Sequence, residues 1–192
     1  MAYGEAARQV FGAAVVTKYA SAAASDAQHY VTSNDFLAAA FSAAHFVRLT
    51  GSKDWSDEDQ ERMSTQLIEE VRLGLQSGHD AGAASRAASL QMLTGDSPWT
   101  EEEMERLRKA LSDIPAQSHV YASVSVADQM ADYLLLGGPL FWSADEFHEM
   151  RTAVIVDFEH CVSRGADVLA ADRLAIFDVL EAALETLITT TA

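Results

Sequence analysis

Hydrophobic residues recur every three or four positions along most of the chain, which is the spacing of one face of an α-helix. Residues 56–77 show this clearly, because Met63, Leu67, Val71 and Leu75 fall on one face. No segment has the sustained polar and apolar alternation that is typical of a β-strand. The pattern predicts an all-α fold of about eight helices in antiparallel hairpins. The expected helices are about 5–24, 33–49, 56–77, 80–93, 100–114, 124–136, 143–163 and 166–189, and residues 115–123 are expected to form a loop.

One stretch of sequence occurs three times. LTGDSPWTEEE at 93–103 matches LTGSKDWSDED at 49–59 and, more loosely, LGGPLFWSADE at 136–146. The period of 44 and then 43 residues also aligns Ala40, Ala84 and Ala127. We interpret these repeats as three units of two helices, about 33–77, 80–114 and 124–163, in a single domain of residues 1–192. Residues 1–30 and 166–192 are expected to cap the ends of a stack that resembles the HEAT or TPR class in architecture.

Each repeated stretch carries the residues that end one helix and begin the next. A glycine ends the first helix, and a hydroxyl residue with an acid three positions later, such as Thr100 with Glu103, has the capping-box spacing. The tryptophan before the hydroxyl residue is expected to pack on the new first turn. The glycines and tryptophans are therefore interpreted as structural: Gly51, Gly95, Gly138, Trp55, Trp99 and Trp142. The same spacing at Thr32 and Asp35 predicts another helix start, after an interruption at residues 25–33.

The chain is strongly acidic, with 13 Lys+Arg against 29 Asp+Glu and a formal net charge of −16. Such a surface repels nucleic acid and anionic membranes and favours a basic partner. More acids gather at the repeated helix starts than capping requires, and we interpret them as a ridge that docks on a basic surface. These candidate partner-binding residues are Asp54, Asp57, Glu58, Asp59, Glu101, Glu102, Glu103, Asp145, Glu146 and Glu149. Adaptation to high salt, or a need for solubility, would produce the same acidity.

We expect no targeting signal in this sequence. The first residues lack the basic segment of a signal peptide, and no apolar run approaches the ~18 residues that span a bilayer. The single cysteine, Cys161, excludes an internal disulfide and is expected to be a small buried residue. We therefore expect a cytoplasmic protein without membrane contact, located in the host cytoplasm if it is encoded by a phage.

Candidate chemistry is sparse, because the chain has no phosphate-binding loop, no nucleophile elbow and no Cys-x-x-Cys pair. His45, His79-Asp80 and Asp128 occur in the order of the metal ligands in the all-α HD phosphohydrolases, which they resemble in this respect alone. A site of that kind requires all four side chains to converge. We otherwise expect no catalytic residue, no metal and no cofactor.

The leading hypothesis is a non-enzymatic module that docks on a basic protein or on a nucleic-acid-binding complex. In its size and acidity the chain resembles phage anti-defence inhibitors that mimic nucleic acid, without binding nucleic acid directly. A scaffold or assembly chaperone is an alternative, and the metal-dependent phosphohydrolase is an alternative of another class. Homodimer formation stays open, because a helical stack can end in an apolar face.

Overall fold

The structure, a computed structural model, describes residues 3–112 and 124–191. This part of the chain forms nine α-helices and contains no β-strand, which confirms the all-α prediction. The predicted loop 115–123 and the last residues of the predicted helix 100–114 lie outside the described residues. The helices are α1 (Glu5–Phe11), α2 (Ala13–Thr32), α3 (Phe36–Thr50), α4 (Asp57–Ser77), α5 (Asp80–Thr94), α6 (Glu101–Ser112), α7 (Val124–Leu135), α8 (Ala144–Ser163) and α9 (Asp167–Thr191).

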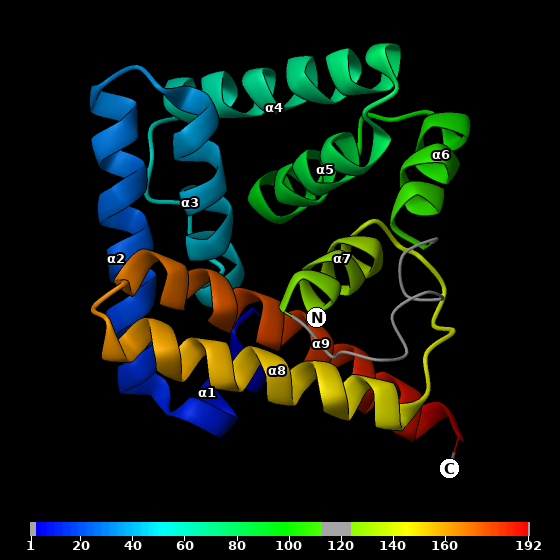
Figure 1. The fold of residues 1–192 in the computed structure, drawn as a ribbon. Coiled ribbons are helices and arrows are strands. Elements are labelled where there is room, and N and C mark those ends of the chain that lie inside the picture. Colours follow the sequence, from blue (N-terminus) through cyan, green and yellow to red (C-terminus); the bar gives the residue numbers. More distant parts are fainter. Residues whose placement is uncertain (1–2, 113–123, 192) are drawn as a thin grey trace.

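The helices alternate between an outer and an inner position in a closed ring (Figure 1). The outer helices α2, α4, α6 and α8 form the four sides, and each packs against the inner helix that follows it. The inner helices contact one another in order, α3 with α5, α5 with α7, α7 with α9 and α9 with α3. The N-terminal and C-terminal segments, which were expected to cap the ends of a stack, contact each other in the ring. Helix α9 packs on both α1 and α2.

The described residues form four pairs of an outer and an inner helix, one more than the number of units that the sequence predicts. The inner helices begin at Phe36, Asp80, Val124 and Asp167, which preserves the spacing of 43–44 residues through α9. The outer helices begin at residues 13, 57, 101 and 144, with the same spacing. The segment 166–192 thus supplies the fourth inner helix, and α2 supplies the first outer helix.

Small residues let the inner helices approach one another closely. The aligned alanines Ala40, Ala84 and Ala127 are all fully buried, as is Ala171 at the equivalent position of α9. The distance between packed helices is set by the side chains at the contact, so a methyl group at each position permits a narrow ring. The repeated buried alanines are therefore typical of closely packed helices.

The repeated loops between inner and outer helices have the predicted capping interactions. Thr100 and Glu103 bond reciprocally through side chain and backbone, as do Ser143 and Glu146. Ser56 accepts from the Asp59 backbone N–H, whereas the shorter Asp59 carboxylate reaches only the Ser56 hydroxyl. Every start of the three repeated outer helices therefore receives a side-chain cap.

The three repeated tryptophans are packing residues. Trp99 and Trp142 are buried, and the half-buried Trp55 packs edge-on against Phe46. Trp142 also packs edge-on against Phe147 in the first turn of α8, with ring centroids 6.2 Å apart, which is the predicted hydrophobic staple. These contacts are compatible with the structural role that the sequence predicts for the tryptophans.

Two predicted details at the helix ends are wrong. Gly51 and Gly95 have the expected positive φ, but in the third unit it is Gly137, not Gly138, that adopts it. Because α7 ends one residue earlier, the Gly137 and Gly138 N–H groups close a Schellman motif onto its last turn. Near the N-terminus, α2 continues without interruption through residues 25–32, and Asp35 itself caps α3 by accepting from the Ala38 N–H.

Candidate functional site

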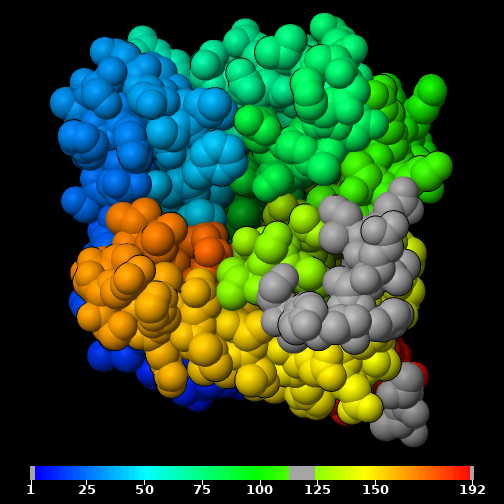
Figure 2. Space-filling model, viewed as in Figure 1, coloured from blue at the N-terminus to red at the C-terminus, as the bar shows by residue number. Residues whose placement is uncertain are grey.

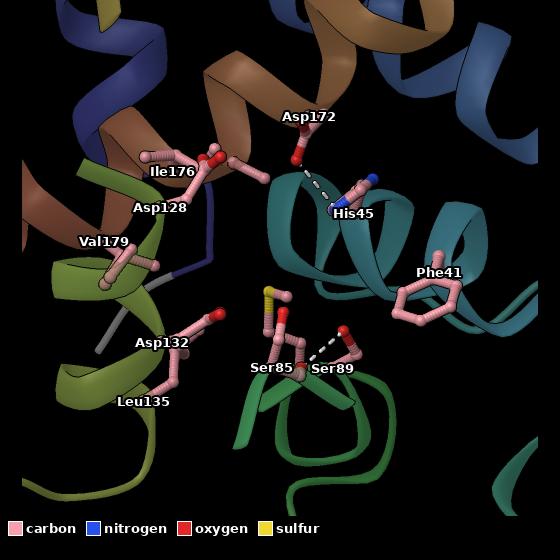
Figure 3. A pocket seen from close by; sticks show the side chains of 13 residues that line it. Phe41, His45, Ser85, Ser89, Asp128, Asp132, Leu135, Asp172, Ile176 and Val179 are labelled. Atoms are coloured by element: carbon pink, nitrogen blue, oxygen red, sulfur yellow. Dashed lines mark hydrogen bonds and ion pairs between the residues drawn. The ribbon is translucent and has the colours of Figure 1, made fainter. Parts of the chain in front are cut away.

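A cavity of about 290 Å³ lies where the four inner helices meet. The surface is hollowed at this point, between the segments of α3, α5 and α9 (Figure 2). Every inner helix contributes to the wall, and Figure 3 shows the side chains converging from all four. The lining residues are Phe41, His45, Ser85, Ser89, Met92, Asp128, Ala131, Asp132, Leu135, Asp172, Ala175, Ile176 and Val179.

The lining follows the sequence repeat. At the spacing of 43–44 residues, one position in each repeat holds Phe41, Ser85, Asp128 and Asp172. The position four residues later, one helical turn on, holds His45, Ser89, Asp132 and Ile176. A third position holds Met92, Leu135 and Val179. The cavity is therefore built in layers along the ring axis, with two layers that carry most of its polar groups and one that is apolar.

The first polar pair in the cavity links the first and fourth repeats. His45 Nε2 on α3 lies 3.0 Å from Asp172 Oδ1 on α9, and both side chains are largely buried. Burial alone would raise the pKa of Asp172, but the charge and hydrogen bond of His45, together with Arg173, lower it below its usual value. Asp172 is therefore ionised across the neutral range.

Asp128 lies one repeat before Asp172, and its pKa is shifted in the opposite direction. Burial and the neighbouring Asp172 carboxylate raise the pKa of Asp128 to about 7, although Arg173 and His45 oppose this shift. Arg173 contacts Asp128 at 3.3 Å and Asp172 at 2.5 Å, and it also bonds Asp157 of α8 at 2.7 Å. Arg173 thus forms ion pairs with three carboxylates. Because its pKa is about 7, the Asp128 carboxyl is partly protonated near neutral pH.

Asp132 extends from α7 toward α5 in Figure 3. Burial raises the pKa of Asp132 well above its usual value, and the Ser85 hydroxyl beside it opposes this only in part. Within the described residues no ion pair reaches Asp132. Burial therefore favours the protonated, neutral form of this carboxyl.

The residues of the predicted phosphohydrolase site fall in two places. His45 and Asp128 line the central cavity, whereas His79 and Asp80 lie at the start of α5 and are absent from its wall. Asp80 is paired there with Arg106 at 2.6 Å, and His79 contacts the Ser77 hydroxyl. Within residues 3–112 and 124–191, no three His, Cys, Asp or Glu side chains are arranged to hold a metal ion. The structure thus brings together two of the four residues, and Cys161 is buried elsewhere.

The ten predicted partner-binding acids divide by their contacts. Asp59, Glu103 and Glu146 are half-buried and accept hydrogen bonds in the helix caps. Glu58 is paired with Arg62, and Glu101 with Arg108. The other five are exposed and have no ion pair to another described residue: Asp54, Asp57, Glu102, Asp145 and Glu149.

The acidic helix starts are distributed around the ring. In Figure 1, α4 begins at the upper left, α6 at the upper right and α8 at the lower right. This distribution follows from ring closure, because equivalent positions of the repeats are rotated about the axis of the ring. The acids thus lie around the circumference of the ring, whereas the stack predicted from the sequence would have them along one edge.

Comparison of the chain with known protein families, with curated proteins and with solved structures found no match. Over the helices that the structure describes, none is both long enough and apolar enough to span a membrane.

Proposed function

We propose that this chain is a ligand-binding protein and that the central cavity holds a small polar molecule. The observation that carries this proposal is the convergence of all four inner helices on one cavity. Equivalent positions of the four repeats supply its polar layers, including His45, Ser89 and Asp132 at one level. A repeat that served packing alone would fill these axial positions with apolar side chains, as it does at the aligned alanines.

The composition of the wall supports a ligand role. Burying a polar group costs free energy unless a partner compensates it, and burying a carboxylate costs more. The cavity nevertheless contains three aspartates, and it is near the lower end of the ~300–1,000 Å³ range that is usual for ligand sites. Its apolar layer, with Met92 and Leu135, faces the same space as the polar layers. This combination would orient a ligand that has both a polar and an apolar part.

The proposal is tested with three probes of equal chain length: 1,4-diaminobutane, 1,4-butanediol and succinate. Alanine methyl groups are labelled with ¹³C and followed by NMR, because Ala131 and Ala175 lie in the wall. At least one probe should shift these two signals in a saturable manner. Ala131→Leu, which adds volume to the wall, should abolish the shift of the Ala175 signal, whereas Ala81→Leu on the exposed side of α5 should not. Failure of all three probes to shift either signal would overturn the proposal.

A second candidate function is docking on a basic protein surface, as the charge of the chain suggests. It is favoured by the five exposed acids without an ion pair to the described residues, and by the net charge of −16. Since these acids lie around the ring, a partner that contacts several of them would have to surround it or contact one of its faces. A single narrow edge contact would engage only one helix start.

Docking of this kind is tested by affinity capture from the native host at low and high salt. Exposed charges are screened beyond roughly 10 Å at 0.1 M salt, so a captured basic partner should dissociate as salt is raised to about 0.5 M. A variant with the five acids changed to Asn or Gln should lose the same partner. Capture that persists in high salt and in this variant would rule out electrostatic docking.

A further inference from the structure

We infer that the ligand of the central cavity is a compact organic cation with two amino groups, which binds between Asp128 and Asp132 of α7 and the wall formed by α9. This inference rests on the proposed ligand-binding function and specifies the chemical class of the ligand. It follows from three properties of the cavity, namely its charge balance, its geometry and its apolar wall.

The charge balance of the cavity is incomplete. Asp128 faces Arg173 and Asp172 of α9, His45 of α3, Asp157 of α8 and Asp132 on its own helix. His45 is already paired with Asp172, and Arg173 is shared among Asp128, Asp157 and Asp172. Four carboxyls thus face two basic side chains, and neither of these basic side chains forms an ion pair with Asp132. The missing positive charge must come from protons or from a bound cation.

The geometry of α7 suits two amino groups. Asp128 and Asp132 are four residues apart, so they lie on one face and about 6 Å apart along the helix. Asp132 points toward α5, while Asp128 lies close to α9 (Figure 3). A chain of four carbons separates two ammonium groups by roughly this distance. Each ammonium donates three hydrogen bonds, which the two carboxylates and the Ser85 and Ser89 hydroxyls can accept.

The wall favours an organic cation over an inorganic one. Ca²⁺ and Mg²⁺ require six or more closely spaced oxygen ligands, and the described residues contain no group arranged to hold a metal ion. Apolar side chains of Ile176, Leu135 and Met92 occupy the remaining surface. A methylene chain would pack against these side chains, whereas a hydrated metal ion would leave them exposed to its water shell.

Release of protons from Asp128 and Asp132 on binding would distinguish a diamine from an uncharged ligand that only fills the cavity. The pKa of Asp128 is raised to about 7, so a proton compensates part of its charge near neutral pH, and burial raises the pKa of Asp132 in the same direction. A bound ammonium stabilises the ionised carboxylates and therefore expels these protons. Binding of the diamine at pH 6.5 should release protons, and its affinity should rise, by up to about tenfold per pH unit for each proton released, as the pH is raised to about 7.

The test is isothermal titration calorimetry of the intact chain with 1,4-diaminobutane and 1,4-butanediol, in two buffers of different ionisation enthalpy. We expect the diamine to bind at least tenfold more tightly than the diol and to release protons. Asp132→Asn and Asp128→Asn should each weaken diamine binding about tenfold or more and reduce the proton release. Asp96→Asn removes one charge from an exposed loop and serves as the matched control. Because Asn preserves the shape of Asp, thermal unfolding of each variant verifies that it folds.

The outcomes distinguish this inference from the function on which it rests. Binding of the diol or of succinate in the cavity without preference for the diamine would overturn the cation assignment and preserve the ligand-binding function. Diamine binding without proton release, or binding that Asp132→Asn leaves unchanged, would also overturn it. Failure of all three probes to bind would contradict the proposed function itself.

Discussion

Arg48 and Asp178 form a buried ion pair, 2.7 Å between Nη2 and Oδ2, that joins the first inner helix of the ring to the last. The two side chains are 5% and 1% exposed, so solvent screens the pair very little. Asp178 also accepts hydrogen bonds from the Gly4 and Ala7 N–H groups at the start of α1. This carboxylate therefore connects α1, α3 and α9 at the point where the ring closes.

Replacement of Arg48 by methionine should destabilise the protein by about 3–5 kcal/mol, because it leaves the Asp178 carboxylate buried without its cation. Arg62→Met is the matched control, since Arg62 forms an exposed pair with Glu58 within one helix and should cost less than about 1 kcal/mol. Urea unfolding monitored by circular dichroism measures both. Equal effects of the two substitutions would show that the pair does not hold the ring closed.

Ionisation of Asp128 should make the free energy of unfolding depend on pH. Its pKa is about 7 in the folded chain against an ordinary value of 3.8, so the folded state binds more protons than the unfolded state between these values. Its contribution to the free energy of unfolding therefore falls as pH rises from about 4 to about 7, and is constant above that. Asp172, whose pKa is lowered, acts in the opposite direction and only at lower pH.

This contribution is isolated by comparison with Asp128→Asn. The difference in unfolding free energy, wild type minus variant, should decrease as pH is raised from 4.5 to 7.5, because Asn cannot ionise. Urea unfolding at several pH values gives the difference directly. A difference that increases with pH would mean that Arg173 dominates and that Asp128 is ionised throughout.

The capping boxes provide a graded test of the repeat. Glu146→Ala removes a bond to the Ser143 backbone N–H and should cost about 0.5–1 kcal/mol. Asp59→Ala removes only a bond to the Ser56 hydroxyl and should cost less, a few tenths of a kcal/mol. Thermal unfolding of the two variants provides the comparison. A larger cost for Asp59→Ala would contradict the assignment of the full box to α8 and the half box to α4.

Two glycines should respond to alanine in opposite directions. A Cβ on Gly138 would lie 2.1 Å from the Tyr133 ring, so Gly138→Ala should destabilise by about 1–3 kcal/mol. A Cβ on Gly82, within α5, would meet only the flexible end of Arg86 at 3.1 Å. Gly82→Ala should therefore stabilise by about 0.5–1 kcal/mol, through helix propensity. Differential scanning calorimetry of both variants checks the signs, and a stabilising Gly138→Ala would contradict the packing of that loop.

Much of the fold could be predicted from the sequence, because both the helical period and the 43–44-residue repeat leave identical residues at packing positions. The fourth repeat could not be found in the same way. The repeated stretch from Leu93 to Glu103 connects an inner helix to the next outer helix, and a ring of four hairpins needs only three such connections along one chain. The fourth junction, between α9 and α2, is a packing contact and carries no repeated stretch of this kind.

The cavity was missed for a related reason. Its positions are as periodic as the alanines, but they hold different residue types, such as Phe41, Ser85 and Asp128. A search for identical residues detects the positions where packing permits only alanine, glycine or tryptophan. Only the closure of the ring shows that the variable positions point to a common axis, and only then do His45 and Asp172 become neighbours.

The most direct test of the proposed ligand site is a crystal structure, determined from crystals of the chain grown at about pH 8 with 1,4-diaminobutane. We expect electron density for the diamine inside the central cavity, with its nitrogens about 2.7–2.9 Å from carboxylate oxygens of Asp128 and Asp132. Density for the diamine only on the outer acidic surface, with ordered water alone in the cavity, would contradict the proposed binding of a diamine in the cavity.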